Sequence, residues 1–167
     1  MNDTLSNSDT PATLAQPIVA HVHLLAIELM MASSARFPEL DQRGNFNVPL
    51  QASDQINAVY HEQDRRVIAV VQLEVNAADD QAKLASWSAV YRLVYQVVDT
   101  YQGDLVKERA EAFCKTYSLA HAWPYWREQL ASQCNKMGLP TVLAPIVVVG
   151  ATPVVQPVLQ GDPPSQG

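Results

Sequence analysis

Glycine and cysteine are scarce in this chain, and their scarcity argues against two kinds of chemistry. Only six glycines occur among 167 residues, and they form no glycine-rich loop of the kind that holds a nucleotide phosphate. An ATP-driven mechanism is therefore not expected. The two cysteines, Cys114 and Cys134, stand alone, without the spacing of a metal site or a redox pair. We expect both to be buried thiols, which suits a reducing compartment.

Long apolar runs and an excess of positive charge are also missing. No stretch approaches the roughly 20 apolar residues of a membrane span, and residues 1–16 are polar and acidic, unlike a secretory signal peptide. The formal net charge of −6 argues against nucleic-acid binding. The 48% of hydrophobic residues is enough for the core of one domain. The sequence predicts an acidic cytoplasmic protein with no membrane or nucleic-acid partner.

The histidines do not form a recognisable catalytic or metal-binding cluster. His21 and His23 fall two residues apart, a spacing that two metal ligands can use, but no third ligand lies nearby. Buried or interface histidines are commoner, and we interpret the pair in that way. His61 and His121 are single histidines near turn-like sequence, and we expect them to be solvated. The sequence predicts no catalytic site, no cofactor and no metal, and therefore a protein that is not an enzyme.

Residues 18–31 alternate like a strand whose two faces are both apolar. One side carries Val19, His21, His23, Leu25, Ile27 and Leu29, and the other carries Ile18, Ala20, Val22, Leu24 and Ala26. A helix is an open alternative for residues 24–32. A strand with two apolar faces suits a sheet that has a helix on one face and another subunit or a bound chain on the other.

Two further segments have the period of two that is typical of a half-buried strand. Val67–Val75 has apolar residues at all odd positions, and the next run places Trp87, Ala89, Tyr91, Leu93, Tyr95 and Val97 on one face. Residues 76–80 are typical of the turn between them. A shorter strand is predicted at Phe46–Leu50, before a break at residues 63–66. This order predicts a hairpin or a meander.

Two helices and two tails complete the prediction. Asp104–Tyr117 has the composition of a short helix, and a longer helix is predicted over Pro124–Met137, because proline suits a first helical turn and Gly138 suits a helix end. Residues 1–16 are too poor in bulky apolar residues to order themselves. We expect a disordered tail at 1–16, one domain at 17–149, and a proline-rich flexible tail at 150–167.

The region around the longer helix reads Trp123-Pro124-Tyr125-Trp126-Arg127-Glu128, followed by Gly138-Leu139-Pro140 and by Leu143-Ala144-Pro145-Ile146, with Tyr117 six residues before Trp123. In order and spacing this region resembles the long helix, the proline stop and the Leu-Ala-Pro segment of the export chaperone family SecB. The resemblance implies an α+β fold, in which a long helix and a short helix pack on a four-stranded antiparallel sheet. It also implies a homotetramer, built as a dimer of dimers with client grooves.

The resemblance leaves the protein partner open. SecB-like proteins usually end in an amphipathic second helix and an acidic tail that help them contact the SecA motor ATPase, and residues 147–167 show neither feature. On the first strand, Glu28 alone stands where an acidic contact for SecA is expected. Another branch of SecB-like proteins serves toxin–antitoxin systems, in which the chaperone shields one antitoxin. The sequence does not choose between these two roles.

Aromatic residues are the candidates for client binding. We expect most of them to belong to the core or to a subunit interface, and the rest to line a groove that binds extended chains. The aromatic candidates are Trp87, Tyr91, Tyr95, Tyr117, Trp123, Tyr125 and Trp126, and the aliphatic Leu143 is added to them. The predicted function is that of an ATP-independent holdase for unfolded or disordered polypeptides.

Two other functions stay open alongside the holdase. One is a structural or adaptor subunit with a single dedicated partner. The other is a hot-dog thioesterase, which needs a positioned acid and a polar acyl-binding turn at the start of its helix. This last possibility is disfavoured, because Pro124 and Trp126 occupy the predicted helix start.

Overall fold

The computed structural model describes residues 10–41, 49–78, 82–140 and 142. Its elements are α1 (Pro11–Ala15), the 3-10 helix η1 (Gln16–His21), β1 (Val22–Arg36), α2 (Pro38–Asp41), β2 (Leu50–His61), β3 (Arg66–Ala78), β4 (Lys83–Val97) and α3 (Val106–Lys136). Four strands form one antiparallel sheet in the order β1-β4-β3-β2. The predicted α+β fold, a four-stranded antiparallel sheet with a long and a short helix, is confirmed, but the helices occupy other residues than those predicted. Leu143 and the expected tail at 150–167 lie outside the described residues.

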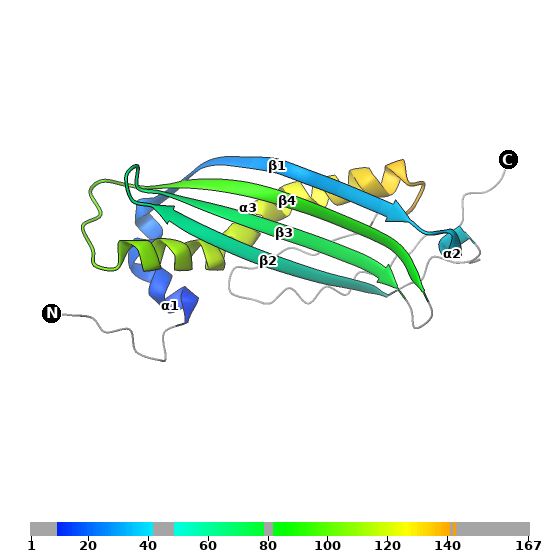
Figure 1. Cartoon of the computed structure of the whole chain (residues 1–167), viewed down its shortest axis with the longest axis horizontal. Helices are drawn as coiled ribbons and strands as arrows, with labels where there is room; N and C mark the ends of the chain where they lie inside the picture. The colour runs from blue at the N-terminus through cyan, green and yellow to red at the C-terminus, as the bar shows by residue number, and fades with distance from the viewer. Residues whose placement is uncertain (1–9, 42–48, 79–81, 141, 143–167) are drawn as a thin grey trace.

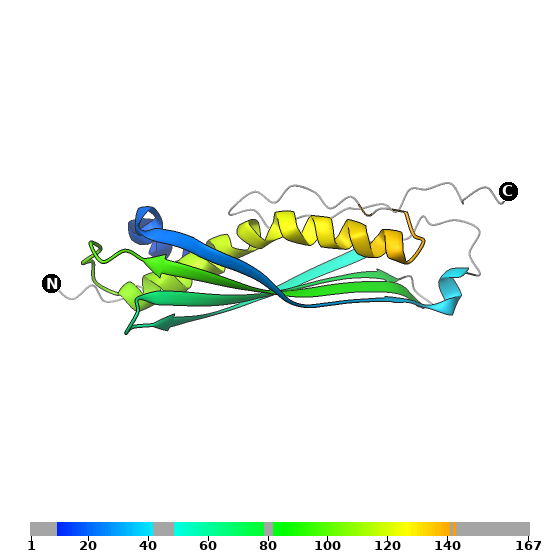
Figure 2. The same cartoon turned by 90° about the horizontal axis from the view of Figure 1, so that it is seen from above.

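Helix α3 crosses one face of the sheet diagonally, as Figures 1 and 2 show. We call this the inner face, and the opposite one the outer face. The inner face of β3 and β4 consists of the odd-numbered residues that sequence analysis assigned to it. Val67, Val71, Trp87, Leu93 and Tyr95 are all fully shielded from solvent there. The sequence shows this alternation of apolar and polar residues because a strand that packs on a helix buries every second side chain.

Strand β1 is present, but its faces differ from the prediction. Two bulges shift its register against β4, one between Leu24 and Ala26 and one between Leu29 and Met31. Each bulge inserts one residue and so reverses which side chains point inward. Leu24, Ile27 and Leu29 therefore share the inner face, whereas a strict alternation separates Leu24 from the other two. The alternative of a helix over residues 24–32 is wrong, and residues 18–21 belong to η1.

Strand β2 is longer than predicted and lies later in the chain. The sequence analysis placed a short strand at Phe46–Leu50, whereas the described strand runs over Leu50–His61. On the inner face of the sheet, β2 contributes Asp54, Ile56 and Ala58, which pair with inner-face residues of β3. Of these, Ile56 and Ala58 are only half-buried. An edge strand with so little burial carries no clear apolar alternation, so its sequence gave no strand signal.

Helix α3 is one continuous element of 31 residues, not two helices. It begins at Val106 and passes through Pro124, which the prediction used as a start. Proline cannot donate to the carbonyl four residues earlier, which here belongs to Ala120, and such a position commonly kinks a helix. Figure 2 shows that α3 changes direction midway. One long buried face outweighs the single lost hydrogen bond.

The predicted helix end is confirmed. The helix ends at Lys136, and Gly138 adopts a left-handed φ of 65°. The Leu139 N–H then donates to the Cys134 carbonyl over 3.0 Å, and the Gly138 N–H donates to the Asn135 carbonyl over 3.1 Å. These bonds satisfy carbonyls that the helix end leaves unpaired.

Residues 11–16, which were expected to be disordered, are helical, and the helical stretch continues to residue 21. Thr10 caps α1 by accepting a hydrogen bond from the Thr13 N–H over 3.3 Å, and Pro11 occupies the first turn. Ala15 and Ile18 are fully buried, and α1 and η1 lie against α3. Packing on α3 therefore orders a segment whose composition alone favoured disorder. None of the described helices is both long and apolar enough to cross a membrane.

Candidate functional site

Most of the predicted client-binding aromatics lie in the core. Trp87 and Tyr95 are fully buried, Trp126 is 1% exposed and Trp123 is 6% exposed. Tyr117 is half-buried and stacks on Phe113 at 4.8 Å between ring centroids. The four buried side chains fill the space between the sheet and α3, so their prediction as residues of a surface groove was wrong. Core and surface aromatics follow the same spacing in the sequence, so the pattern does not distinguish them.

Two of the candidates do meet at a concave site. A pocket of about 370 Å³ opens between β1 and α3, and we call it the Tyr91 pocket. It is lined by Ile27 and Leu29 of β1, Tyr91 of β4, and Tyr125, Glu128, Gln129 and Ser132 of α3. The four α3 residues recur at spacings of three, one and three, so they form one stripe on the helix. That stripe is largely polar and faces apolar residues of β1.

Tyr91 is the least exposed wall of this pocket. The side chain is 2% exposed, and its hydroxyl has no hydrogen-bond partner in the described part of the chain. Burial, together with the negative charge of Glu128, raises the pKa of Tyr91 to about 12. The hydroxyl is therefore protonated at neutral pH and is free to donate or accept. Tyr125 is half-exposed at the pocket mouth.

The exposed apolar surface is concentrated on strand β1. Of the eight large hydrophobic residues that are exposed among the described residues, five belong to β1: Leu24, Leu25, Leu29, Met30 and Met31. Leu25 and Met30 occupy the two bulges and have no partner on β4. Strand β1 is an edge of the sheet, so the backbone N–H and C=O groups on the side away from β4 have no partner within the sheet. An extended chain therefore finds both backbone partners and apolar contacts here.

The opposite edge of the sheet has a different character. Strand β2 exposes Gln51, Ser53, Asp54, Gln55 and Asn57, which are polar or charged. Charged and polar side chains on an edge strand discourage pairing with other chains. The two edge strands thus differ in their exposed side chains, and the surface of β1 is the more apolar and the more suited to pairing with another chain.

The outer face of the sheet carries a second apolar surface. Val59, Ile68, Val94 and Ala26 are paired in turn across the four strands and form one apolar row. In the neighbouring row, the Arg92 guanidinium donates to the Glu28 carboxylate over 2.9 Å. Glu28 was predicted as a contact for a partner, and its charge is balanced by this ion pair. Its role as a partner contact stays a prediction.

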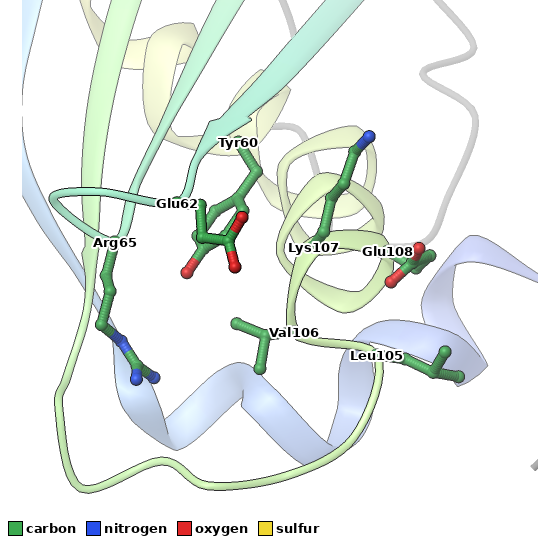
Figure 3. Close-up of a pocket in the computed structure, with 7 residues that line it drawn as sticks. All are labelled: Tyr60, Glu62, Arg65, Leu105, Val106, Lys107 and Glu108. Carbon is green, nitrogen blue, oxygen red and sulfur yellow. The ribbon is translucent and has the colours of Figure 1, made fainter. Parts of the chain in front are cut away.

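A larger hollow of about 720 Å³ lies between the β2–β3 turn and the start of α3 (Figure 3). Tyr60, Glu62 and Val106 point into it, and Lys107 points away. Arg65 also lines it, but its guanidinium is engaged with the carbonyls of Val98 and Tyr101 over 3.2 and 2.7 Å. Both acidic and basic groups line this hollow, so its charge selects no ligand class.

The first turn of α3 also lines this hollow and bears on the thioesterase alternative. Because the helix starts at Val106, Pro124 and Trp126 are not at its start, and that reason for disfavouring the thioesterase was wrong.

The histidines show no metal site. His21 lies in η1 with its ring against Tyr101, 5.0 Å between centroids, whereas His23 is exposed on β1. No group of three or more potential metal-binding side chains occurs in the described ranges. His61 is exposed as predicted, but His121 is half-buried, and its Nδ1 lies 3.0 Å from the Tyr95 hydroxyl. Burial lowers the pKa of His121, so the expectation of a solvated ring was wrong for this residue.

Both cysteines are buried thiols, as predicted. Burial raises the pKa of Cys114 to about 12 and also raises that of Cys134. The thiolate that acts as a nucleophile is therefore essentially absent at neutral pH.

Comparison with known proteins shows the fold. The structure is similar to a SecB-like chaperone of Mycobacterium tuberculosis, Rv1957, that was solved in complex with a ChAD peptide from the HigA1 antitoxin. The TM-score is 0.68 at 12% sequence identity, over 83% of this chain and 96% of that one. The SecB-like fold implied by the sequence resemblance is thereby confirmed. No protein-family model and no curated protein matches the sequence.

A second solved structure is much less similar. It is a protein of unknown function from Streptococcus agalactiae, with a TM-score of 0.38 and 10% identity over 72% of this chain and 94% of the other. That likeness is too weak to support an argument about fold or function.

Proposed function

We propose that this protein is an ATP-independent holdase that binds unfolded or disordered polypeptides and keeps them soluble. The observation that carries the proposal is strand β1, a 15-residue edge strand with five exposed large apolar side chains. Main-chain pairing does not depend on side-chain identity, and apolar contact is non-directional, so such an edge accepts many sequences. The SecB-like fold supports the proposal, because the similar mycobacterial protein is a chaperone.

The two bulges in β1 fit this role. Long flat edges tend to pair without limit and aggregate, and bulges interrupt an edge by twisting it locally. In β1 they leave three regular segments, residues 22–24, 26–29 and 31–36. Short segments favour reversible pairing with a client over the growth of a continuous sheet. The net charge of −6 adds solubility to the loaded complex.

Assembly into a homotetramer, a dimer of dimers, is part of the proposal. The apolar row on the outer face, defined above by Val59 and its three partners, supports it. A sheet face has no unpaired backbone groups, so it suits a fixed packing partner better than a changing client. We assign subunit contacts to the outer face and client contacts to β1.

The client is either a broad range of unfolded chains or one dedicated chain. The mycobacterial protein was solved with an antitoxin peptide, which supports an antitoxin as a dedicated client here. Delivery to the SecA motor ATPase would use Glu28, whose carboxylate is already paired with Arg92. We therefore favour an antitoxin or general client over SecA. The buried free thiols suit a cytoplasmic location, and the inert cysteines support a binding protein over an enzyme.

Aggregation of a chemically unfolded client, diluted into buffer without nucleotide, tests the proposal. At near-stoichiometric ratio we expect the protein to suppress light scattering by the client. The double variant Leu25→Ser, Met30→Ser should lose most of this suppression, because both side chains are more than half exposed on β1. Asp54→Ser is the control, because Asp54 is also exposed but lies on the inner side of β2, the other edge strand, away from the outer-face row.

The outcomes separate the alternatives. Suppression by the wild type and by Asp54→Ser, with loss in the β1 double variant, supports a holdase that uses β1. A folded oligomer that does not suppress aggregation but binds one antitoxin with defined stoichiometry would replace the general holdase with a dedicated chaperone. Equal suppression by all three proteins would remove β1 from the site.

A further inference from the structure

Strand β1, the proposed client edge, carries two adjacent methionines that are open to solvent. Met30 and Met31 are 56% and 58% exposed, which makes them the most exposed of the five large apolar side chains of β1. Met137 is the other methionine within the described ranges, and it is half-buried against the core just after the end of α3. Solvent therefore has access to two thioethers on the client edge and much less access to the third.

The second bulge of β1 explains this exposure. The register against β4 shifts between Leu29 and Met31, so that Met31 pairs with Val90 and Met30 has no partner residue. The extra residue of a bulge stands outside the regular rows of cross-strand side chains. Strand β1 has no neighbouring strand on its other side. Met30 thus lacks a cross-strand neighbour altogether, and Met31 has one on a single side.

Methionine brings a reversible change of polarity to this edge. When a peroxide oxidises a thioether, an S–O bond forms as the O–O bond breaks, the sulfur gives two electrons to the peroxide, and the second oxygen leaves as water. Methionine sulfoxide reductases reverse the change. Hydrogen peroxide is uncharged, so the net charge of −6 does not repel it. The exposed leucines of β1 have no such chemistry.

We propose that Met30 and Met31 are a redox-sensitive switch in the client edge, and that their oxidation by peroxide weakens client binding to β1. A sulfoxide is polar, so oxidation removes the two most exposed apolar contacts of the strand. The backbone N–H and C=O groups of the edge do not change. The switch rests on the proposed holdase function and adds regulation to it, because the reduced strand holds clients and the oxidised strand releases them.

Peroxide treatment of the full-length oligomer tests the switch. Catalase removes the hydrogen peroxide before the unfolded client is added, so that only the chaperone is oxidised, and mass spectrometry of peptides measures the sulfoxide at each methionine. We expect Met30 and Met31 to be oxidised before Met137. The amount of protein needed for half-maximal suppression of light scattering should rise about five-fold. Methionine sulfoxide reductases A and B, added together, should restore the original amount.

Leucine variants assign the effect to residues. Leucine has nearly the volume of methionine and is not oxidised by peroxide, so Met30→Leu, Met31→Leu should suppress aggregation with or without treatment. Met137→Leu is the matched control and should respond to peroxide as the wild type does. Met30→Gln, Met31→Gln carries polar side chains of similar length and should suppress poorly without any peroxide. Each single leucine variant should keep part of the response, which provides a test that does not depend on the double variants.

Stability and assembly of the oxidised protein separate a surface effect from damage to the fold. Both side chains are exposed, so the urea midpoint of unfolding and the oligomer size should be the same before and after treatment. A lower midpoint or a smaller oligomer would show that the sulfoxides act on packing or on subunit contacts, and would overturn the switch.

The failures of the switch and of the holdase are distinguishable. Full suppression by protein that carries sulfoxide at both positions overturns the switch and leaves the holdase intact. So does an equal loss of suppression in the wild type and in Met30→Leu, Met31→Leu, or oxidation of Met137 ahead of the other two. An untreated oligomer that does not suppress aggregation overturns the holdase, and the switch with it.

Discussion

Replacement of Trp126 by alanine is the sharpest test of how the sheet and α3 hold together. Trp126 is 1% exposed and lies on the face of α3 that packs into the core. A buried tryptophan removes roughly 150–250 Å² from solvent, which at about 25 cal/mol/Å² is about 4–6 kcal/mol as an upper bound. Large-to-small replacements of this kind cost about 3–5 kcal/mol in practice. We expect Trp126→Ala to lose about 4 kcal/mol.

Urea unfolding at a fixed protein concentration measures this loss, since oligomers become more stable as concentration rises. With a slope of about 2 kcal/mol per molar urea, the midpoint should fall by about 2 M. Tyr125→Ala is the matched control on the adjacent residue. Tyr125 is half-exposed, so its replacement should cost about 1 kcal/mol or less. Equal midpoints for the two variants would refute the packing of Trp126 in the core.

Three further perturbations have defined signs. Burial lowers the pKa of His121, so the unfolded chain binds a proton at this residue more readily than the folded chain does. The contribution of His121 to stability should be complete above about pH 6.5 and should fall as the pH drops below that value. In a series of thermal melts at different pH values, His121→Gln should flatten this decrease. Gly138→Ala should cost about 1 kcal/mol in urea unfolding, because φ is 65° and, among the described residues, the new Cβ would meet only Arg36 Nη1, at 3.6 Å; an unchanged midpoint would contradict a left-handed cap. Leu105→Asn should raise the melting temperature, because Leu105 has a φ of 55° that asparagine tolerates better, and a lower value would show that its side-chain packing matters more.

The regular part of the sheet was predictable because burial there follows one rule. In β3 and β4 each second side chain packs on the helix side, and the sequence shows this as uninterrupted alternation from Val67 to Val75 and from Trp87 to Val97. The faces of β1 were not predictable by the same rule. Its bulges coincide with the consecutive apolar residues Leu24-Leu25 and Met30-Met31, and such doublets within a strand are the signal that a strict alternation overlooks.

The length of α3 was hidden by Pro124. Proline is common in a first helical turn and rare in a helix interior, so the local rule placed a start there. A pattern over a longer stretch of sequence indicates the continuous helix. Buried residues recur every four positions without interruption across Pro124, and they are Ala110, Cys114, Ser118, Ala122, Trp126, Leu130 and Cys134. Tertiary packing of that face outweighs one lost hydrogen bond.

The candidate site was predictable only in part. Tyr91 and Tyr125 were among the aromatic candidates, but their spacing did not distinguish them from the core residues Trp87 and Tyr95. Glu128 stood in the quoted motif without an assigned role. Its meeting with Tyr91 depends on how α3 crosses the sheet, and no local pattern in the sequence encodes that crossing. The exposure of β1 likewise depends on its place at the edge of the sheet.

Amide hydrogen exchange of the protein, alone and with a bound unfolded client, tests the central claim most directly. The account predicts that client binding slows exchange along β1, at residues 22–36, and leaves β2 at residues 50–61 unchanged. β2 is the internal comparison, because it is the other edge of the same sheet. Protection at β2, or no protection at β1 while the client remains bound and soluble, would contradict the claim that β1 holds the client.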